Sequence, residues 1–476
     1  MERLRISKVL EMAPSPNKIT ICGWVRTFRN DRFLAVNDGS TIHNIQLVVQ
    51  REDLEESVLK QLNTGAAIRA VGVLVESQGG GQSVEIQVEE LEILGGADPD
   101  EFPIQMKKHS LEFLREKAHL RFRTNTFSAI FRIRHLLQFA VHKFFHDQGF
   151  YQLHTPIITG SDAEGAGEMF KVTTLDLDSL PKLKDGGTDF SQDFFGKPSN
   201  LTVSGQLEAE LAAMSLGQVY TFGPTFRAEN SNTSRHLAEF WMIEPEIAFA
   251  DLKDDMKLAE DCLKSVLGYV LKHGKDDLDF LENREVQSEK QLPQKDRHEL
   301  PLTERLKNVV ESKFAHMTYT EVINALRNSK PFKKKKFKYP CEWGDDLHSE
   351  HERWLVEKHI GGPVIVTDYP AEIKAFYMRQ NDDGKTVAAM DVLLPGIGEI
   401  IGGSQREERL DILKKKCADF NIPEDHVWWY LETRKFGSAE HCGFGMGFER
   451  LVMFATGMSN IRDVIPFPRT PLSAEF

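Results

Sequence analysis

Two strand-like runs on either side of a short polar loop constrain the fold of this chain more than any other feature. The runs are QVYTFGPTFRAE at 218–229 and AEFWMIEPEIAF at 238–249, and both are rich in aromatic and β-branched residues. The loop that joins them, 230–237, is short and polar. The runs are therefore predicted to pair as antiparallel strands. Because strands and helices alternate elsewhere beyond residue 100, we expect an α+β domain, with a large antiparallel sheet and helices.

The first hundred residues predict a separate small β-barrel. Five short strand-like runs with one helical run, 52–62, after the third are the layout of an OB-fold, which often binds single-stranded nucleic acid. An SH3-like barrel is the alternative fold for this region. The five runs are KITICGWVRTF, RFLAVND, IQLVVQ, AAIRAVGVLVE and SVEIQVEELEIL.

Turn-forming residues at 95–99, GGADP, mark a domain boundary near residue 100. We expect a linker or hinge over 101–124, and a second domain over 125–476. That domain begins with a predicted helix, Asn125 to Gln148, because its apolar residues recur at helical spacing. Gly149 can end this helix in a left-handed conformation, and a strand, FYQLHTPII, is expected after it.

Charge and cysteine usage narrow the class of protein. The net charge of −13 disfavours a nucleic-acid partner, but basic residues crowd the first 35 residues and the stretch 107–134. On charge alone, solvated faces explain such runs. The five cysteines form no CxxC pair, which argues against a zinc ribbon and a disulfide framework. With no apparent signal peptide or membrane span, we expect a cytoplasmic protein.

The segment 226–246, FRAENSNTSRHLAEFWMIEPE, carries groups suited to a nucleotide. Arg227 and Glu229 are predicted to end one strand on the same face, with Arg235 and His236 in the loop and Phe240 on the returning strand. Guanidinium groups bind phosphates bidentately, and an aromatic face stacks a base. A charged hairpin with its ion pairs in water is the alternative for an arbitrary sequence of this kind.

The order of these residues resembles motif 2 of the class II aminoacyl-tRNA synthetases. GFGMGFER at 443–450 resembles motif 3, and the helix 125–148 with its following strand is similar to motif 1, the dimer interface of that class. The resemblance covers nearly the whole chain, barrel included, and points to the subgroup that activates aspartate, asparagine and lysine. It implies a homodimer that uses ATP and Mg²⁺ to load an amino acid onto tRNA.

The resemblance assigns the nucleotide site residue by residue. Arg227 would meet the α-phosphate, Arg450 the outer phosphates, and both are expected to be catalytic. Asp391 and Glu399 resemble the carboxylates that hold Mg²⁺, although their spacing is one residue longer than the family pattern and Gly402 replaces a frequent serine. The predicted ATP-binding set is Arg227, Glu229, Arg235, His236, Leu237, Phe240, Glu399, Gly447 and Arg450.

Two positions, Ala209 and Glu244, favour asparagine as the amino acid, and Arg406 resembles the arginine that meets the substrate side chain in this subgroup. Ala209 replaces a lysine that pairs with the substrate carboxylate in aspartyl enzymes, and a neutral amide needs no such cation. Glu244 replaces an aspartate and could accept a hydrogen bond from the amide NH₂, while Arg406 would donate to the amide oxygen. For Glu244 a structural ion pair is the alternative. The group that resembles the holder of the substrate ammonium is Glu164, Ser204 and Gln206.

Within the barrel, Phe33 and Gln46 occupy the positions where related enzymes stack and hydrogen-bond the middle anticodon base. Lys107 stands where aspartyl relatives carry a glutamate that reads the third anticodon base. The resemblance therefore implies that tRNA(Asn) is the nucleic-acid partner.

Three other functions remain open from the sequence. One is an aspartyl enzyme that also charges tRNA for asparagine, against which Ala209 argues. The second is a synthetase-like protein that has lost catalysis, and the third is a relative of amide-forming asparagine synthetases. Arg227, Phe240 and Arg450 disfavour the second, and the barrel disfavours the third. The segments Asp176 to Asn200 and Lys333 to Lys338 receive no role.

Overall fold

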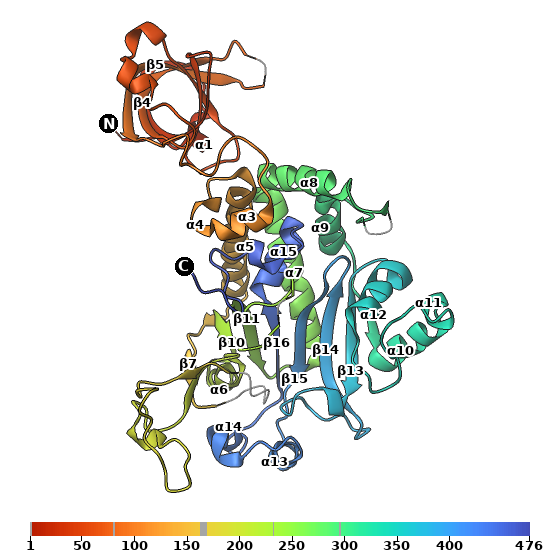
Figure 1. The fold of residues 1–476 in the computed structure, drawn as a ribbon. Helices are drawn as coiled ribbons and strands as arrows, with labels where there is room; N and C mark the ends of the chain where they lie inside the picture. The colour runs from red at the N-terminus through yellow and green to blue at the C-terminus, as the bar shows by residue number, and fades with distance from the viewer. Residues whose placement is uncertain (1, 80, 162–168, 232, 295–296) are drawn as a thin grey trace. The chain divides into compact units, whose positions relative to one another are not determined.

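The computed structural model divides the chain into two compact units, residues 1–131 and 132–476 (Figure 1). The described residues are 2–79, 81–161, 169–231, 233–294 and 297–476.

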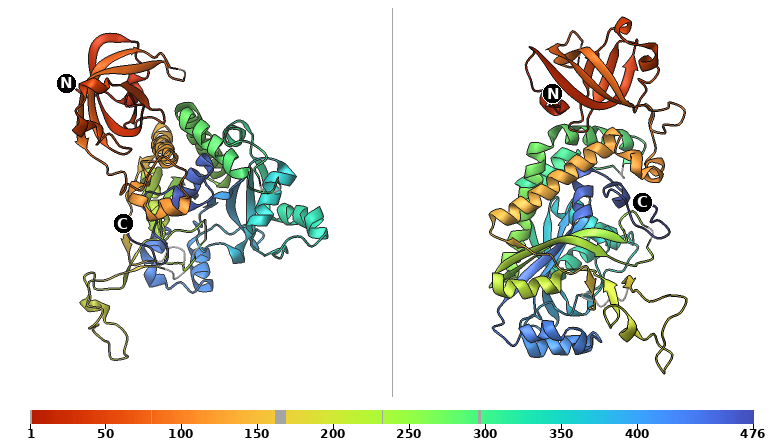
Figure 2. Two further views of the ribbon diagram at one scale, coloured as in Figure 1. Left: turned by 45° about the horizontal axis from the view of Figure 1, so that its top comes forward. Right: turned by 90° about the vertical axis from the view of Figure 1, so that its left-hand side faces the viewer.

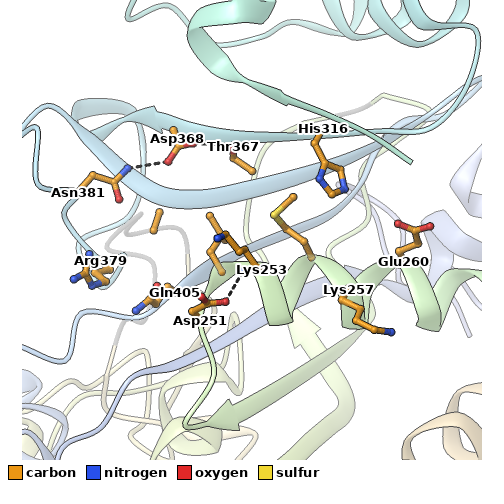
Figure 3. A pocket seen from close by; sticks show the side chains of 13 residues that line it. Asp251, Lys253, Lys257, Glu260, His316, Thr367, Asp368, Arg379, Asn381 and Gln405 are labelled. Carbon is orange, nitrogen blue, oxygen red and sulfur yellow. Dashed lines mark hydrogen bonds between the residues drawn. The ribbon is translucent and has the colours of Figure 1, made fainter. Parts of the chain in front are cut away.

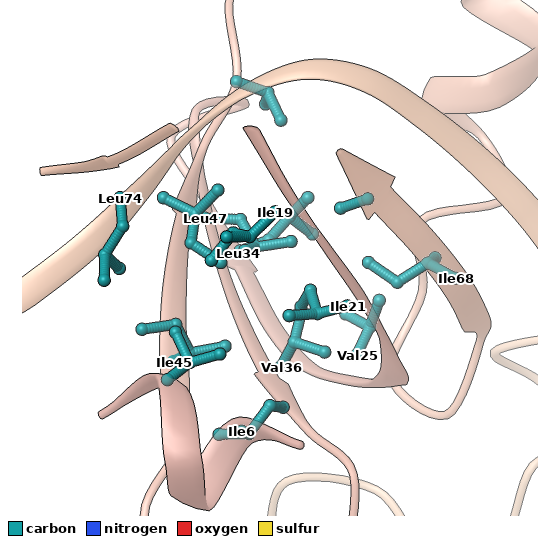
Figure 4. Close-up of a cluster of buried hydrophobic side chains, with 14 of the residues drawn as sticks. Ile6, Ile19, Ile21, Val25, Leu34, Val36, Ile45, Leu47, Ile68 and Leu74 are labelled. Carbon is teal, nitrogen blue, oxygen red and sulfur yellow. The ribbon is translucent and has the colours of Figure 1, made fainter. Parts of the chain in front are cut away.

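Five strands in the first unit form a closed barrel of order β1-β2-β3-β5-β4, as the sequence predicts. Alternation along each strand sends residues such as Leu34 and Leu47 into a core that is fully buried (Figure 4). The predicted helix 52–62 is too long. Leu54 has an extended backbone, which separates η1 from α2, and α2 has no buried residue that would anchor a longer helix. The elements are α1 (Ile6–Val9), β1 (Ser15–Arg29), β2 (Phe33–Asn37), β3 (Ile45–Val48), η1 (Arg51–Asp53), α2 (Glu56–Leu59), β4 (Ala67–Glu76) and β5 (Val84–Gly95).

The predicted linker contains two short helices, α3 (Leu111–Glu116) and α4 (Ala118–Arg121). The hydroxyl of Ser110 caps α3 by accepting from the Phe113 N–H at 3.2 Å. Arg123 donates to the Gly65 carbonyl at 3.1 Å, so this segment contacts the barrel. The boundary near residue 100 and the hinge stay predictions.

The second unit is built on an eight-stranded sheet of order β12-β13-β14-β15-β16-β11-β10-β6. Its central pairs are antiparallel and only the outermost pair at each end is parallel, which confirms the predicted α+β class. The strands are β6 (Tyr151–Gln152), β10 (Gln218–Phe226), β11 (Glu239–Ala248), β12 (Ala315–Thr318), β13 (Val364–Pro370), β14 (Thr386–Leu394), β15 (Gly398–Gln405) and β16 (His441–Gly447).

Two strand predictions need correction. β10 ends at Phe226, so Arg227 and Glu229 follow the strand, where the sequence turns polar. The single strand FYQLHTPII is wrong: β6 stops at Gln152, and Pro156 separates it from β7 (Ile158–Thr159). β7 belongs to a small second sheet with β9 (Ser199–Leu201) and β8 (Lys171–Val172).

Helices cover the large sheet from both sides (Figure 2). α5 (Asn125–Asp147) matches its prediction, and Gly149 after it has φ +84° as expected. α7 (Leu252–His273), capped by Asp251, and α15 (Phe448–Thr456) pack on the sheet, as does α6 (Gln206–Leu216). The remaining helices are α8 (Lys275–Glu289), α9 (Leu302–Glu311), α10 (Tyr319–Asn328), α11 (Lys330–Lys333), α12 (Ser349–Trp354), α13 (Leu410–Asp419) and α14 (Trp428–Thr433). No helix within the described ranges is long and apolar enough to span a membrane.

Candidate active site

The register of four strands brings the predicted site residues onto one face of the sheet. Asp391 lies opposite Gly402, Gly402 opposite Gly445, and Glu246 opposite Gly443. Residues that face each other across antiparallel strands point to the same side. We call this side, which carries Asp391, Gly402, Gly445 and Glu246, the site face. Asp255 of α7 lies against Gly403, the neighbour of Gly402, so α7 covers the opposite side.

The hairpin of β10 and β11 brings the predicted nucleotide residues together. The Arg227 guanidinium carbon lies 5.4 Å from the Phe240 ring centroid, and Arg227 Nη1 is 3.9 Å from the Glu229 carboxylate. His236 Nε2 lies 3.9 Å from the other oxygen of Glu229. The end of the hairpin therefore places the Arg227 guanidinium, which can bind a phosphate, next to the Phe240 ring, which can stack on a base. Leu237, also predicted here, is buried.

Arg450 on α15 contacts Glu399 of β15. Its Nη1 donates to the Glu399 carbonyl at 2.9 Å and lies 3.8 Å from the Glu399 carboxylate. Gly447 is the residue that precedes α15, opposite Met242. Arg227 and Arg450 both stabilise the charged form of Glu399, although burial and Asp391 raise its pKa overall. Arg227, Arg450 and Glu399 thus lie close enough to one another to interact electrostatically.

The two predicted metal ligands converge on the empty position above Gly402. A methyl group built on Gly402 would lie 3.3 Å from Glu399 Oε1 and 3.5 Å from Asp391 Oδ1. Two carboxylate oxygens around a space without a side chain suit a hard cation that keeps several waters. The residues therefore fit Mg²⁺. The pairing of β14 and β15 shifts register between Val392 and Leu393, within the stretch that separates the two ligands.

A third carboxylate, which the sequence reasoning missed, borders this position. Glu352 on α12 accepts from the Glu399 N–H at 3.3 Å. Burial, with Glu399 and Asp391 nearby, raises the pKa of Glu352 to about 7. Its neighbour Ser349 accepts from Arg235 at 3.3 Å. A cavity of about 620 Å³ opens here, lined by Arg235, Glu352 and Gly398 among others.

Ser204, Gln206 and Glu244 lie together where α6 begins. One oxygen of Glu244 accepts from the Ser204 hydroxyl, and the other from the Gly205 N–H at 3.1 Å and Thr221 Oγ1 at 2.9 Å. Among the residues that the structure describes, Glu244 is thus a buried hydrogen-bond acceptor and forms no ion pair. Its predicted contact with a substrate amide stays a prediction. Glu164 lies outside the described residues.

Arg406 is the centre of a buried ionic network. It is 2% exposed, and its Nη2 and Nε lie 2.5 and 3.2 Å from the two oxygens of Glu246. Glu210 is 3.8 Å away and also pairs with Arg434 at 2.7 Å. Gln206 donates to Glu210 at 3.1 Å, which connects the network to the start of α6.

The charge of Arg406 is therefore already balanced by protein groups. Burial alone would raise the pKa of Glu210, but Arg434, His441 and Arg406 outweigh it and lower that pKa. Burial raises the pKa of Glu246, and Arg406, which donates to both of its oxygens, opposes this rise and favours the ionised form. An additional carboxylate in this place would find two acidic groups on the guanidinium, whereas a neutral amide adds no charge.

The sequence contains signals for part of this network. Glu246 follows Glu244 by two residues on a strand, and Glu210 follows Gln206 by four on a helix, so each shares a face with a predicted residue. Nothing in the sequence links Arg434 to Glu210, because more than two hundred residues separate them. Ala209 is fully buried beside Val219.

In the barrel, Phe33 and Gln46 share one outer face, because Ala35 lies opposite Gln46 and alternates with Phe33. Gln46 donates to Glu85 at 3.0 Å. Lys107 is exposed in the segment after the barrel.

A second cavity, of about 690 Å³, lies on the side of the sheet that α7 covers (Figure 3). Lysines of α7, including Lys253 and Lys257, line it with acidic residues such as Asp368. None of the predicted site residues lines it.

Fold and site together define a synthetase of class II. The chain matches the family described as tRNA synthetases class II (D, K and N) over residues 110–471, and it belongs to this family. Residues 19–94 match the family described as OB-fold nucleic acid binding domain, which settles the choice between the two barrel types.

Individual relatives are more specific. The chain is 59% identical to the Asparagine--tRNA ligase of Cytophaga hutchinsonii and 55% identical to that of Porphyromonas gingivalis, covering at least 99% of every chain compared. It also resembles the crystal structure of asparaginyl-tRNA synthetase from Pyrococcus horikoshii complexed with asparaginyl-adenylate. That match has a TM-score of 0.83 and 31% identity, and covers 100% of this chain and 99% of that one.

Proposed function

We propose that this chain is an asparagine–tRNA ligase, which activates L-asparagine with ATP and transfers it to the 3′-end of tRNA(Asn). The observation that carries the choice of amino acid is the network of Arg406, whose charge Glu246 and Glu210 already balance. The same amino acid stands in the names of the relatives.

In the proposed reaction, the asparagine carboxylate attacks the α-phosphorus of ATP, giving asparaginyl-adenylate and pyrophosphate. The terminal hydroxyl of tRNA then attacks the carbonyl carbon of the adenylate, so that the aminoacyl ester forms and AMP leaves. No nucleophile from the protein is required, so catalysis rests on positioning and charge. Arg227 would hold the α-phosphate, Arg450 the outer phosphates, and Phe240 would stack on the adenine.

Asp391 and Glu399 would hold Mg²⁺, which neutralises charge on the phosphates when bound. In the amino-acid site, Arg406 would donate to the amide oxygen and Glu244 would accept from the amide nitrogen. Ser204, Gln206 and Glu164 would hold the substrate ammonium.

ATP–pyrophosphate exchange with asparagine and aspartate in parallel tests the proposal. We expect exchange with asparagine and at most weak exchange with aspartate. Preference for aspartate would instead establish the second candidate, an aspartyl enzyme.

Arg227→Ala is expected to abolish exchange in a folded protein, because the α-phosphate loses its guanidinium. Lys385→Ala, which removes an exposed cation at the start of the β14 hairpin, is the matched control. Near-normal exchange in Arg227→Ala would contradict the nucleotide site.

We also propose that the barrel reads the anticodon through Phe33, Gln46 and Lys107. A homodimer through α5 and the strand after it is supported by the exposed side chains of Phe139, Tyr151 and Ile158. All five cysteines are free, which fits a reducing cytoplasm. Light scattering of the purified chain tests the dimer.

A further inference from the structure

A lysine lies on one of the two proposed Mg²⁺ ligands. Lys374 Nζ donates to both oxygens of Asp391, at 2.8 and 3.0 Å, and lies 3.9 Å from the ring centroid of Tyr369. The side chains of Lys374 and Asp391 are only 18% and 14% exposed. Both carboxylate oxygens of Asp391 therefore already have a cationic partner, in a site largely shielded from water.

The surroundings explain why a cation is stable there. Asp391 and Glu399 converge on the space above Gly402, and Glu352 lies beside Gly398 and accepts from the Glu399 N–H. Glu399 faces Arg450, at 3.8 Å, whereas the Asp391 side of the cluster has Lys374. The two sides of the acidic cluster thus have separate cations.

A divalent ion in this space would lie close to the ammonium of Lys374. In a partly buried site two cations at such short range repel strongly, because solvent screening is weak. The polyphosphate of ATP would add negative charge beside both of them and offset this repulsion. Lys374 therefore weakens the binding of a metal ion in the absence of ATP, and much less so when ATP is bound.

We propose that Lys374 is a positioning residue that makes Mg²⁺ binding at Asp391 and Glu399 conditional on ATP. This inference rests on the proposed function, because it takes Asp391 and Glu399 as the metal ligands. By linkage, the ion must then strengthen ATP binding by the same factor as ATP strengthens binding of the ion.

Binding of Mn²⁺, followed by the electron paramagnetic resonance of the free ion, tests this without any turnover. The purified chain is titrated alone and with ATP in the absence of amino acid. In Lys374→Met we expect the dissociation constant of Mn²⁺ without ATP to fall by about tenfold or more, equivalent to about 1.4 kcal/mol. The strengthening of Mn²⁺ binding by ATP should shrink correspondingly.

Two variants serve as controls. Lys374→Arg keeps the charge and should retain weak binding of Mn²⁺ without ATP. Lys385→Met removes an exposed lysine and should behave as the unchanged chain does. If Lys374→Met does not fold, Lys374→Gln keeps a donor for Asp391 while losing the charge, and the same tenfold change is expected.

Unchanged or weaker Mn²⁺ binding without ATP, in a folded variant that lacks the charge, overturns the inference. The metal site itself is tested separately by Glu399→Gln, which should weaken Mn²⁺ binding in the presence of ATP. If it does not, the proposed metal ligands are wrong, whatever Lys374 does.

Discussion

At the scale of single residues, the most unusual group is a buried acid outside the proposed chemistry. Asp255 on α7 is fully buried, and neither carboxylate oxygen has a hydrogen-bond partner within the described structure. Burial raises its pKa from 3.8 to about 8, although Arg406 opposes the shift. The carboxyl is therefore uncharged in the folded chain over a range in which the unfolded chain ionises it.

This difference predicts how stability depends on pH. Between pH 4 and 8 the unfolded chain binds fewer protons at this residue, so the free energy of unfolding falls as the pH rises through this range. Asp255→Asn removes the contribution. The variant should gain about 3 kcal/mol relative to the unchanged chain between about pH 5.5 and 8, from about 1.36 kcal/mol per pH unit over most of this range.

Urea unfolding at several pH values measures this difference. Asp261→Asn, on an exposed residue of the same helix, is the control and should show no such trend. A constant difference between Asp255→Asn and the unchanged chain would show that Asp255 is ionised when folded.

At the scale of elements, substitutions of two glycines in β16 are expected to destabilise the fold by different amounts. A methyl group on Gly443 would lie 2.3 Å from the Pro245 carbonyl oxygen, on the backbone of β11. One on Gly445 would meet only the end of the Met242 side chain, at 2.9 Å. We expect Gly443→Ala to lower the free energy of unfolding by about 3 kcal/mol and Gly445→Ala by less than about 1 kcal/mol. Equal losses in urea unfolding would contradict the register of β11 and β16.

A buried ion pair joins α5, α15 and β11. Arg134 Nη2 lies 2.7 Å from Glu449, whose other oxygen accepts from the Trp241 N–H at 2.8 Å. Their side chains are 12% and 1% exposed, so loss of the arginine leaves a buried charge.

Arg134→Met is therefore expected to destabilise the chain by about 3 kcal/mol. Thermal and urea unfolding measure the loss. Because the methionine retains most of the apolar volume, Arg134→Met with Glu449→Gln should recover part of it. A double variant no more stable than Arg134→Met would show that the stability loss does not come from the unpaired carboxylate.

These contacts also show which parts of the structure the sequence can predict. Periodicity located the barrel strands, α5 and the hairpin of β10 and β11, because alternation and helical spacing are local. It failed at FYQLHTPII, where Pro156 separates residues that join different sheets. The network around Arg406 joins α6 and β11 with Arg406, which follows β15, and Arg434, which follows α14, and no local sequence pattern predicts such long-range contacts.

At the scale of the whole molecule, the two units have different proposed roles, recognition of tRNA and formation of the adenylate. The barrel has its own hydrophobic core, and Phe33 and Gln46 lie on its outside. The described members of the nucleotide and amino-acid clusters, from Ser204 to Arg450, all lie in the second unit. Adenylate formation should therefore not require the barrel, whereas recognition of tRNA should.

A chain that begins at residue 101 tests this division and the predicted boundary near residue 100. We expect it to keep asparagine-dependent pyrophosphate exchange within about twofold. Its KM for tRNA should rise by about tenfold or more, since stacking of a single base on an aromatic side chain contributes about 1–3 kcal/mol. Phe33→Ala in the full chain should show the same pattern more weakly. If the shortened chain folds but loses exchange, the catalytic unit depends on the barrel, and both the boundary and the division of labour are wrong.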